Sequence, residues 1–459
     1  MRSSWLCAVL VGGVALLSLS ACSDSSNVGL GVGPDSLSGG QPITLDVKPE
    51  LDTARTLPIT GESSRKAPIR NTWRVLAGVV DDPLPGTGVI EAEGYLDFAG
   101  RSSLPSEIEL ANSADSLTAE LRLTPNYLHG NSSDAVAMEV YDLTEEATMD
   151  SARANDSFDA DETDPASVDT AQINPTDSLV TIELRESWIA ENLSTLQNTS
   201  DNGTAFEENF PGFKIVALNS QAVIGFSSFD ATLRLTYTSE SDTVTADYSG
   251  LKSFTHIEQR GVTEEPPSSH KLLQDGAGMD LTMKWDYGEE ELSEEEKKGG
   301  KVDSLKISPL NRAEIFVPID TSAMKNRSRE NFDRPLPKGY RVIATREPDA
   351  PSCGAVRLPV FSEANEACVL VLEPSAAPGA AFASDNVAFT IFEESFRRVQ
   401  SGQSPLFTEY RVQVTDREST SGDTRSTIQP GLPSTLPVLV PVDGEEPGPP
   451  RATLTVTPL

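Results

Sequence analysis

The sequence predicts an all-β fold: two tandem antiparallel β-sandwich domains that arise from an internal duplication, with long acidic loops. Three observations predict it. Apolar and polar residues alternate along successive short segments, Gly, Pro, Asp and Ser separate those segments, and the whole series occurs twice. Alternation gives each strand one face for a core and one face for water, which is typical of antiparallel sandwiches rather than of parallel sheets.

The alternation is clearest in the segment 117–124, where Leu or Ala occupies every second position. The same period of two predicts further strands at 136–141, 182–184, 213–217 and 233–237. After residue 184 the spacing becomes helical, so a short helix is expected around Trp188. We expect Trp73, Trp188 and Trp285 in the core rather than on a surface that stacks on sugars.

Four segments of the first half recur in the second half in the same order. Segment 118–125 (TAELRLTP) is similar to 311–318 (NRAEIFVP), 181–188 to 390–396, 213–218 to 410–414, and 230–238 to 451–458. The offsets run from about 190 to about 220 residues, and loops tolerate such differences in length at small entropic cost. We therefore predict a duplication, with a first domain at 70–240 and a second domain at 250–459.

The first 21 residues are predicted to be a signal peptide that is removed. Arg2 supplies the positive start, and an apolar stretch from Trp5 to Leu19 follows that is too short to span a bilayer. The residues Leu19-Ser20-Ala21-Cys22 are similar to the bacterial lipobox at all four positions. This similarity implies signal cleavage between Ala21 and Cys22 and lipid attachment at Cys22. The alternative is an ordinary signal peptide followed by a chance cysteine.

Residues 22–42 are rich in Ser, Gly and Asp and lack periodicity, so they are predicted to be a flexible tether. Ser23 follows the predicted lipidated cysteine, which resembles sorting to the outer membrane rather than retention at the inner one. Several acyl chains make a stable anchor where one chain is only marginal. We therefore expect a lipid-anchored protein of the outer membrane, on its periplasmic side or on the cell surface.

The charge balance excludes one class of partner. The chain has 36 Lys and Arg against 70 Asp and Glu, a net charge of −34. Such a field repels nucleic acid, so we expect no nucleic-acid partner. The excess of acid fits adaptation to high salt and fits an ordinary acidic exported protein equally. Much of it lies in two polar segments, 150–178 and 286–301, which are predicted to be solvated loops.

Two cysteines remain for the folded protein, Cys353 and Cys368, because Cys7 leaves with the signal peptide. An even pair in an oxidising compartment predicts a disulfide. Apolar residues at 358–361 suggest a hairpin that brings the two ends together, and the closed loop would stabilise the fold by roughly 3 kcal/mol. Two buried thiols are the alternative.

Several motifs in fixed order resemble those of the domain-of-unknown-function 4270 lipoproteins of Gram-negative outer membranes. They are a Cys-Ser-Asp start followed by 28–31 (VGLG), then 78–84 (GVVDDPL), 210–215 (FPGFKI), 273–278 (LQDGAG) and 310–315 (LNRAEI). Each half is also similar, more loosely, to jelly-roll modules of carbohydrate-active and cell-surface proteins. The family has no assigned activity, so the resemblance implies a location and a fold but no mechanism.

Catalytic and zinc motifs are weak. Ser322-x-x-Lys325 and 384–386 (SDN) match two signatures of penicillin-interacting serine enzymes, but the prolines between them forbid the helical domain that this mechanism needs. The three histidines, His129, His256 and His270, have no ligand-like spacing and are expected to be ordinary loop or rim residues. We predict no catalytic residues and no cofactor.

Calcium is the better metal candidate. Five acidic residues lie close together in the chain: Asp156, Asp159, Asp161, Glu162 and Asp164. Carboxylate oxygens at this density suit Ca²⁺, although the EF-hand pattern fails for want of its central Gly and its final Glu. A solvated acidic loop without metal is the simpler interpretation, and we predict no metal ligands.

The sequence thus predicts a lipoprotein with a non-catalytic binding or scaffold role. The partners expected are the membrane, through lipid on Cys22, and a glycan or an envelope protein that contacts loops between strands. The alternative is a glycan-active hydrolase that uses paired carboxylates the sequence does not identify.

Overall fold

The computed structural model describes most of the chain beyond the predicted tether. The described residues are 43–55, 74–144, 156–219, 222–239, 242–262, 265–274, 279–285, 310–327, 329–337, 339–346, 361–363, 367–374, 380–384, 392–395, 397–399, 401–415, 435–444 and 448–456. Within them the fold is all-β, and every strand pair runs antiparallel. The predicted fold class is therefore confirmed.

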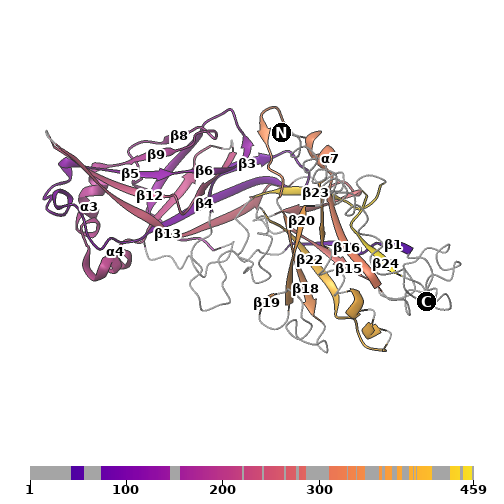
Figure 1. The fold of residues 1–459 in the computed structure, drawn as a ribbon. Helices are drawn as coiled ribbons and strands as arrows, with labels where there is room; N and C mark the ends of the chain where they lie inside the picture. Colours follow the sequence, from indigo (N-terminus) through magenta and orange to yellow (C-terminus); the bar gives the residue numbers. More distant parts are fainter. Residues whose placement is uncertain are drawn as a thin grey trace, which may run out of the picture.

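The first sheet contains 12 strands, nearly all from residues 74–260 (Figure 1). Its order is β17-β6-β11-β3-β4-β13-β12-β5-β9, with β10 beside β4 and β7, and β8 beside β7. The strands are β3 (Arg74–Asp82), β4 (Gly88–Phe98), β5 (Leu117–Leu123), β6 (Pro125–Asn131), β7 (Val136–Asp142), β8 (Ala171–Ile173), β9 (Val180–Leu184), β10 (Phe213–Ala217), β11 (Ala222–Ser227), β12 (Thr232–Thr238), β13 (Thr243–Arg260) and β17 (Phe332–Asp333).

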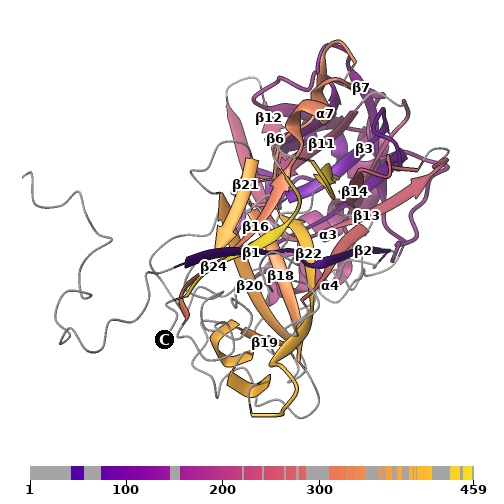
Figure 2. The ribbon, with the colours of Figure 1, turned by 90° about the vertical axis from the view of Figure 1, so that its right-hand side faces the viewer.

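The second sheet also contains 12 strands and follows the order β1-β24-β16-β21-β20-β18-β22-β15-β14-β23, with β19 beside β20 and β2 beside β15. Figure 2 faces this end of the molecule, where β1 pairs with β24. The strands are β1 (Ile43–Val47), β2 (Glu50–Arg55), β14 (His270–Gln274), β15 (Met279–Lys284), β16 (Leu310–Ile319), β18 (Gly339–Arg346), β19 (Phe361–Glu363), β20 (Ala367–Pro374), β21 (Ala380–Ser384), β22 (Phe407–Thr415), β23 (Pro437–Pro441) and β24 (Arg451–Val456).

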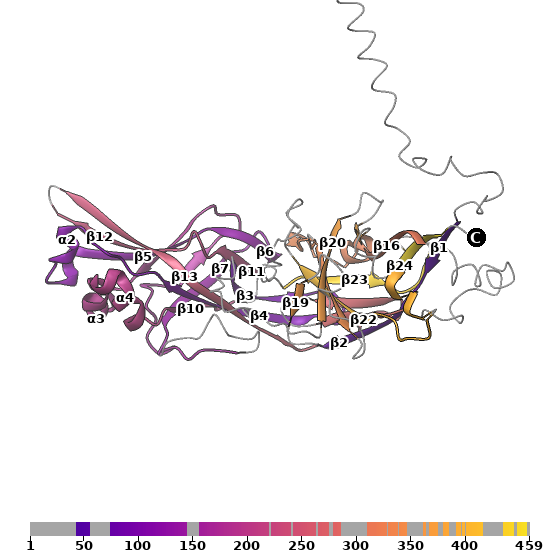
Figure 3. The ribbon, with the colours of Figure 1, turned by 60° about the horizontal axis from the view of Figure 1, so that its bottom comes forward.

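Helices are short and lie mostly at the end of the first sheet farthest from the second (Figure 3). The labelled ones are α2 (Ser106–Glu109), α3 (Glu186–Leu196), α4 (Thr204–Asn209), α7 (Thr321–Lys325) and the 3-10 turns η2 (Ala114–Ser116) and η3 (Ser200–Gly203), and residues 392–395 and 397–399 are also helical. The helix expected around Trp188 is α3. Within the described residues, no helix has the length and apolar composition needed to cross a bilayer.

The first sheet folds over itself at β13. The first part of β13 pairs with β12, and its second part pairs with β4 after a register shift at Gly250. A Cβ atom at Gly250 would lie 2.3 Å from the carbonyl oxygen of Ser228, so only glycine permits this close approach. One strand therefore belongs to two layers, as in sandwiches whose strands change sheet at a bulge.

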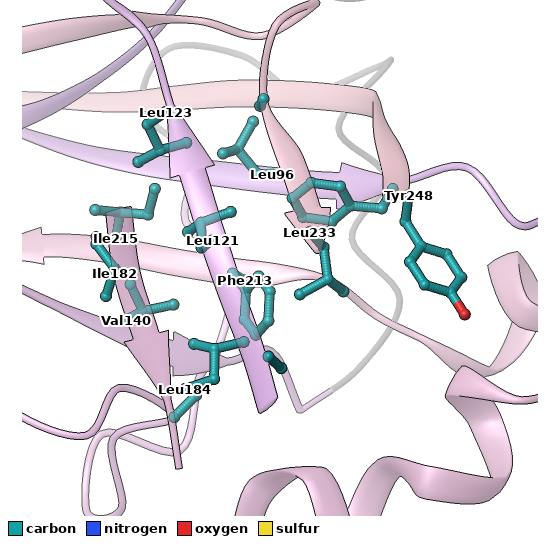
Figure 4. Packing of buried hydrophobic residues seen from close by; sticks show 14 of the residues in the cluster. Leu96, Leu121, Leu123, Val140, Ile182, Leu184, Phe213, Ile215, Leu233 and Tyr248 are labelled. Carbon is teal, nitrogen blue, oxygen red and sulfur yellow. The ribbon is translucent and has the colours of Figure 1, made fainter. Parts of the chain in front are cut away.

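These layers enclose the first core, which is built from alternate residues of both. Figure 4 shows Leu121 and Leu233 from one layer facing Phe213 and Ile215 from the other. The predicted inward positions of the segment 117–124 are buried in this core. Trp188 also lies there, and Trp285 is buried in the second core, so both tryptophans are where the sequence placed them.

The second core consists of side chains of the second sheet that pack on one another and on side chains of the first sheet. Strand β4 reaches both cores: Leu96 and Phe98 pack in the first core, whereas Ile90 and Ala92 pack in the second. On β3, Gly78 has φ +146°, and a Cβ atom there would lie 2.1 Å from the carbonyl oxygen of Ala222. The second core joins the two sheets, since Val80 and Ile90 of the first sheet pack in the same cluster as Leu454 of the second.

The strands cross the predicted division of the chain. Strand β13 runs through the interval 240–250 that separates the predicted domains, and β1 and β2 join the second sheet although they precede both. The strands predicted to be equivalent do pair alike, β5 with β12 and β16 with β24. Beyond these pairs the strand orders of the two sheets differ, so the duplication into tandem sandwiches stays a prediction.

The signal peptide, Ala21, Cys22, the tether, Trp73, Cys353 and the acidic segment 286–301 lie outside the described residues. Cys368 lies in β20, where its backbone is paired with Ala344 and Ser362. The hairpin expected before Cys368 is present, since β19 pairs with β20. The disulfide itself stays a prediction.

Candidate functional site: a buried polar network between the two sheets

The most chemically suggestive cluster lies where the two sheets meet. Five side chains form what we call the junction network: Asp82, Tyr127, His129, Arg334 and Thr435. Asp82 ends β3, and Tyr127 and His129 lie on β6, so three members come from the first sheet. Arg334 follows β17, and Thr435 precedes β23 of the second sheet. The network therefore connects segments more than 300 residues apart in the chain, such as Tyr127 and Thr435.

Local structure fixes each member. The chain leaves the second sheet after α7 and adds the two-residue strand β17 to the edge of β6, with Phe332 opposite Asn131. The backbone N–H of Ser132 donates to the carbonyl of Asn331 at 2.9 Å, which extends this pairing. The edge of the first sheet is thereby covered by a segment of the second half. Arg334 follows directly and is brought against Asp82.

Asp82 is the centre of the network. Its Oδ1 accepts from Nη2 of Arg334 at 2.7 Å and from the backbone N–H of Leu84 at 2.8 Å. Its Oδ2 accepts from Nε2 of His129 at 2.6 Å and from Nε of Arg334 at 3.1 Å. Arg334 thus binds both oxygens, the bidentate geometry that the guanidinium favours.

The histidine continues the network to the hydroxyl of Thr435. Because the carboxylate can only accept, Nε2 of His129 carries the proton, and in the neutral ring Nδ1 accepts from Thr435 Oγ1 at 2.8 Å. The backbone N–H of Thr435 in turn donates to the hydroxyl of Tyr127 at 3.1 Å, and the two hydroxyls lie 3.2 Å apart.

Burial and charge act in opposite directions on Asp82. Burial raises the pKa of this carboxyl, but the hydrogen bonds and positive charges of His129 and Arg334 more than offset burial and lower the pKa to about 2. Asp82 is therefore ionised at neutral pH and paired with a cation that is also buried. A buried charge that loses its partner is strongly destabilising, so the pair holds the segment after β17 against the end of β3.

The order hydroxyl, imidazole, carboxylate is that of a nucleophile, its base and the acid that orients the base. The side chains of Asp82 and His129 have no exposed surface, and Thr435 is also fully buried. A substrate could reach Thr435 only if one sheet moved away from the other. The geometry therefore makes the network a structural connection between the sheets.

Sequence reasoning missed this network. We expected His129 to be an ordinary loop or rim residue, and that was wrong, because it is wholly buried on β6. The signal was present: Tyr127 and His129 are two residues apart on a strand and share its inward face. Asp82 was visible only as part of the motif 78–84. His256 on β13 and His270 on β14 are partly exposed, and His270 contacts Asp320 at 3.0 Å.

The acidic residues weighed for calcium are engaged separately. Glu162 contacts Lys214, Asp164 contacts Arg185, and Asp161 accepts from the backbone and hydroxyl of Thr163. Within the described residues, no three His, Cys, Asp or Glu side chains are placed to share a metal ion. Acidic residues that are neighbours in the sequence therefore contact different partners in the fold.

The remaining residues considered for catalysis also lie in different parts of the fold. Ser322 and Lys325 are exposed on the five-residue helix α7. The buried aspartates Asp97 and Asp280 lie on different strands, β4 and β15, near Lys252 and Arg411 respectively.

Asp142, at the end of β7, is the carboxyl whose properties best suit an acid catalyst. Burial raises its pKa to about 6, although Nε1 of Trp188 donates to both of its oxygens at 2.8 Å. The charge of Glu191 also raises the pKa of this carboxyl. A carboxyl that is partly protonated near neutral pH can act as a general acid.

No protein-family model matches the chain, and no curated protein matches it. The resemblance to the domain-of-unknown-function 4270 lipoproteins therefore stays a prediction.

Proposed function

We propose that this protein is a lipid-anchored outer-membrane lipoprotein with a non-catalytic binding or scaffold role. The observation that carries the proposal is the junction network. Its hydroxyl, imidazole and carboxylate are arranged as in a hydrolase, yet all three are buried, and the carboxylate is bound to Arg334. Groups that could do chemistry serve instead to hold a long β structure in one shape, as a rigid recognition body requires.

The anchor in this proposal is lipid on Cys22, followed by the tether 22–42. The tether would join the fold at β1, which lies at one end of the second sheet's strand order. A flexible chain of this length has a root-mean-square reach of roughly 25 Å. The first sheet would then extend beyond the second, away from the point of attachment. The proposed partners are a glycan or an envelope protein, and the proposed family is the domain-of-unknown-function 4270 lipoproteins.

The anchor is tested by the mature protein itself. We expect the N-terminus at Cys22 with lipid mass attached, and partitioning of the protein into detergent. Changing Cys22→Ala should release the protein or mislocalise it. An intact mature N-terminus at Ser23 or beyond, without lipid, would rule out the anchor.

The binding role is tested by incubating the purified protein with a panel of polysaccharides and with outer-membrane extracts. Both retention and product release are scored. We expect retention on at least one ligand and no soluble product. Release of soluble fragments would contradict the non-catalytic role.

A glycan-active hydrolase is the second candidate, and Asp142 is the observation that favours it. Its raised pKa is that of a general acid, and Glu191 is the carboxylate whose charge acts on it. If product release is seen, Asp142→Asn should abolish it while retention persists. Release that survives this substitution would exclude Asp142 as the acid.

A further inference from the structure

The outer face of the first sheet, opposite the two cores, carries an unusual row of side chains. The register pairs Phe254 with Tyr95, Tyr95 with Lys214, and Lys214 with Tyr141. Directly opposed residues of antiparallel strands point to the same face. These four side chains, which we call the outer row, therefore cross β13, β4, β10 and β7 in one line. With strands about 4.8 Å apart, the line is roughly 14 Å long.

A phenylalanine from another segment covers the aromatic end of the outer row. The ring of Phe158 lies 5.3 Å from that of Tyr95 and 5.6 Å from that of Phe254, edge-on to both at 87° and 75°. Tyr95 and Phe254 are themselves 5.8 Å apart and have no exposed surface. The three rings form an apolar cluster separate from the two main cores.

The segment that carries Phe158 is bound to the sheet differently on the two sides of Asp159. From Asp159 onward it is bound by backbone hydrogen bonds, since Thr144 N–H donates to Asp159 at 3.0 Å and Asp161 N–H donates to Asp142 at 3.0 Å. Before that point, residues 156–158, which we call the flap, contact the sheet through the Phe158 ring, and two hydrogen bonds join the flap backbone to side chains of β13 and β4. These are His256 to the Asp156 carbonyl at 2.9 Å and Phe158 N–H to the Tyr95 hydroxyl at 3.5 Å. Displacement of the flap about Asp159 would leave these backbone bonds of Asp159 and Asp161 in place.

Polar groups lie directly beside the covered rings. The ammonium of Lys214 is 2.9 Å from Glu93 and 2.7 Å from Glu162, and the hydroxyl of Tyr95 donates to Glu93 at 2.9 Å. Lys214 is 8% exposed, whereas Glu162 is 58% exposed. The inner pair, Lys214 and Glu93, is neutral overall and offers both donors and an acceptor.

We propose that the Tyr95–Phe254 face is a binding site for an uncharged oligosaccharide, and that Phe158 occupies it in the absence of ligand. The proposal rests on the proposed binding function and names its site. A pyranose ring presents C–H groups to aromatic faces, as the edge of Phe158 does, and its hydroxyls can bond to Glu93 and Lys214. A net charge of −34 disfavours an anionic saccharide.

The flap makes binding conditional. A ligand must wait for, or cause, displacement of Phe158, so its apparent affinity is reduced by the fraction of molecules in which the flap is open. Removing the Phe158 ring abolishes this requirement. The variant Phe158→Ser should therefore bind more tightly than the unaltered protein, an outcome opposite to that of damaging a binding residue.

The experiment is affinity electrophoresis of the full mature protein in gels containing neutral polysaccharides: a β-glucan, a mannan and a xylan. Phe158→Ser should lower the dissociation constant for at least one of them by about tenfold or more. Phe254→Ala in the Phe158→Ser background should abolish the gain. Phe229→Ser is the matched control, because Phe229 is 45% exposed on the loop between β11 and β12, outside the outer row. Phe158→Leu, which keeps an apolar side chain, replaces Phe158→Ser if that variant fails to fold.

Three results would overturn the proposal. Unchanged retention in all variants would leave the binding function standing and exclude this face as the site. A gain that survives Phe254→Ala would place the site elsewhere. Absence of retention on every polysaccharide, in folded unaltered protein and variants alike, would exclude glycan binding here, and retention of an envelope protein instead would assign a different partner class.

Discussion

Two regions of this protein each bury a basic side chain against carboxylates, and they differ in what encloses them. In the junction network, Arg334 is 4% exposed and Asp82 is fully buried, with a sheet on either side. On the outer face, Lys214 is 8% exposed, but its partner Glu162 lies on a surface segment and is 58% exposed. The first ion pair belongs to the interior of the molecule, and the second belongs to a covered surface.

The comparison shows that the degree of burial decides whether an ion pair fixes a structure. A pair that is desolvated on both sides cannot lose one member without leaving a buried charge, so it fixes a structure. A pair with one exposed member is screened by water and contributes little, so it can break and reform. The junction should therefore resist change, whereas the outer face should be adjustable.

The largest expected effect is at Arg334. Arg334→Met should lower the free energy of unfolding by about 3–5 kcal/mol, because it leaves the buried carboxylate of Asp82 without its cation. The matched control is Arg329→Met, since Arg329 contacts Asp81 at 2.8 Å but both side chains are at least half exposed. Arg329→Met should lower the free energy of unfolding by at most about 1 kcal/mol. Urea unfolding of both variants measures this, and equal losses would remove the distinction between the two regions.

The next effect is acid sensitivity arising from Asp82. Its pKa in the folded protein, about 2, lies below the ordinary 3.8, so its contribution is fully present above pH 4 and is lost as pH falls from 3.8 toward 2. The contribution is about 2 kcal/mol. The measurement is the free energy of unfolding against pH for the unaltered protein and for Asp82→Asn. The difference between the two curves should shrink below pH 4, and a constant difference would contradict the assigned pKa.

Asp142 should show the opposite sign, because it is buried without a cation that outweighs the burial. Its folded pKa of about 6 lies above the ordinary 3.8, so ionisation destabilises the fold as pH rises from about 4 to 6. Asp142→Asn, whose amide oxygen still accepts from Trp188, should stabilise the protein at pH 7 by about 1–2 kcal/mol and have little effect at pH 3.5. Destabilisation at pH 7 would show that the ionised carboxylate is favoured there.

The smallest effect is expected at Glu162. Glu162→Gln removes an exposed charge from Lys214, which keeps Glu93, so the loss should be under about 1 kcal/mol. Glu93→Gln is the informative comparison, because Glu93 is 20% exposed and contacts both Lys214 and Tyr95. Glu93→Gln should lower the stability of the protein more than Glu162→Gln does. Thermal unfolding of the two variants measures this. A larger loss of stability for Glu162→Gln than for Glu93→Gln would mean that Lys214 is held more firmly by Glu162 of the covering segment than by Glu93.

The sequence predicted the local structure well and the long-range structure poorly. Alternation found strands such as β5 and β12 because each buries one face, a property that a single segment carries. It did not find that β13 crosses the predicted domain boundary, because a strand that changes partner keeps the same alternation. Nor could it place Arg334 against Asp82, since that contact depends on β17 joining an edge 200 residues away in the chain. The spacing of His129 from Tyr127 fits the inward face of a strand, but the partners of His129, Asp82 and Thr435, lie far from it in the sequence and could not be predicted.

The junction network, as we propose it, serves structure and not catalysis. The most direct test compares the unaltered protein with His129→Asn on soluble polysaccharides and simple carboxylic esters, with product release and unfolding temperature measured together. We expect no product from either protein and a lower unfolding temperature for His129→Asn. Product released by the unaltered protein and lost in a folded His129→Asn variant would contradict this expectation.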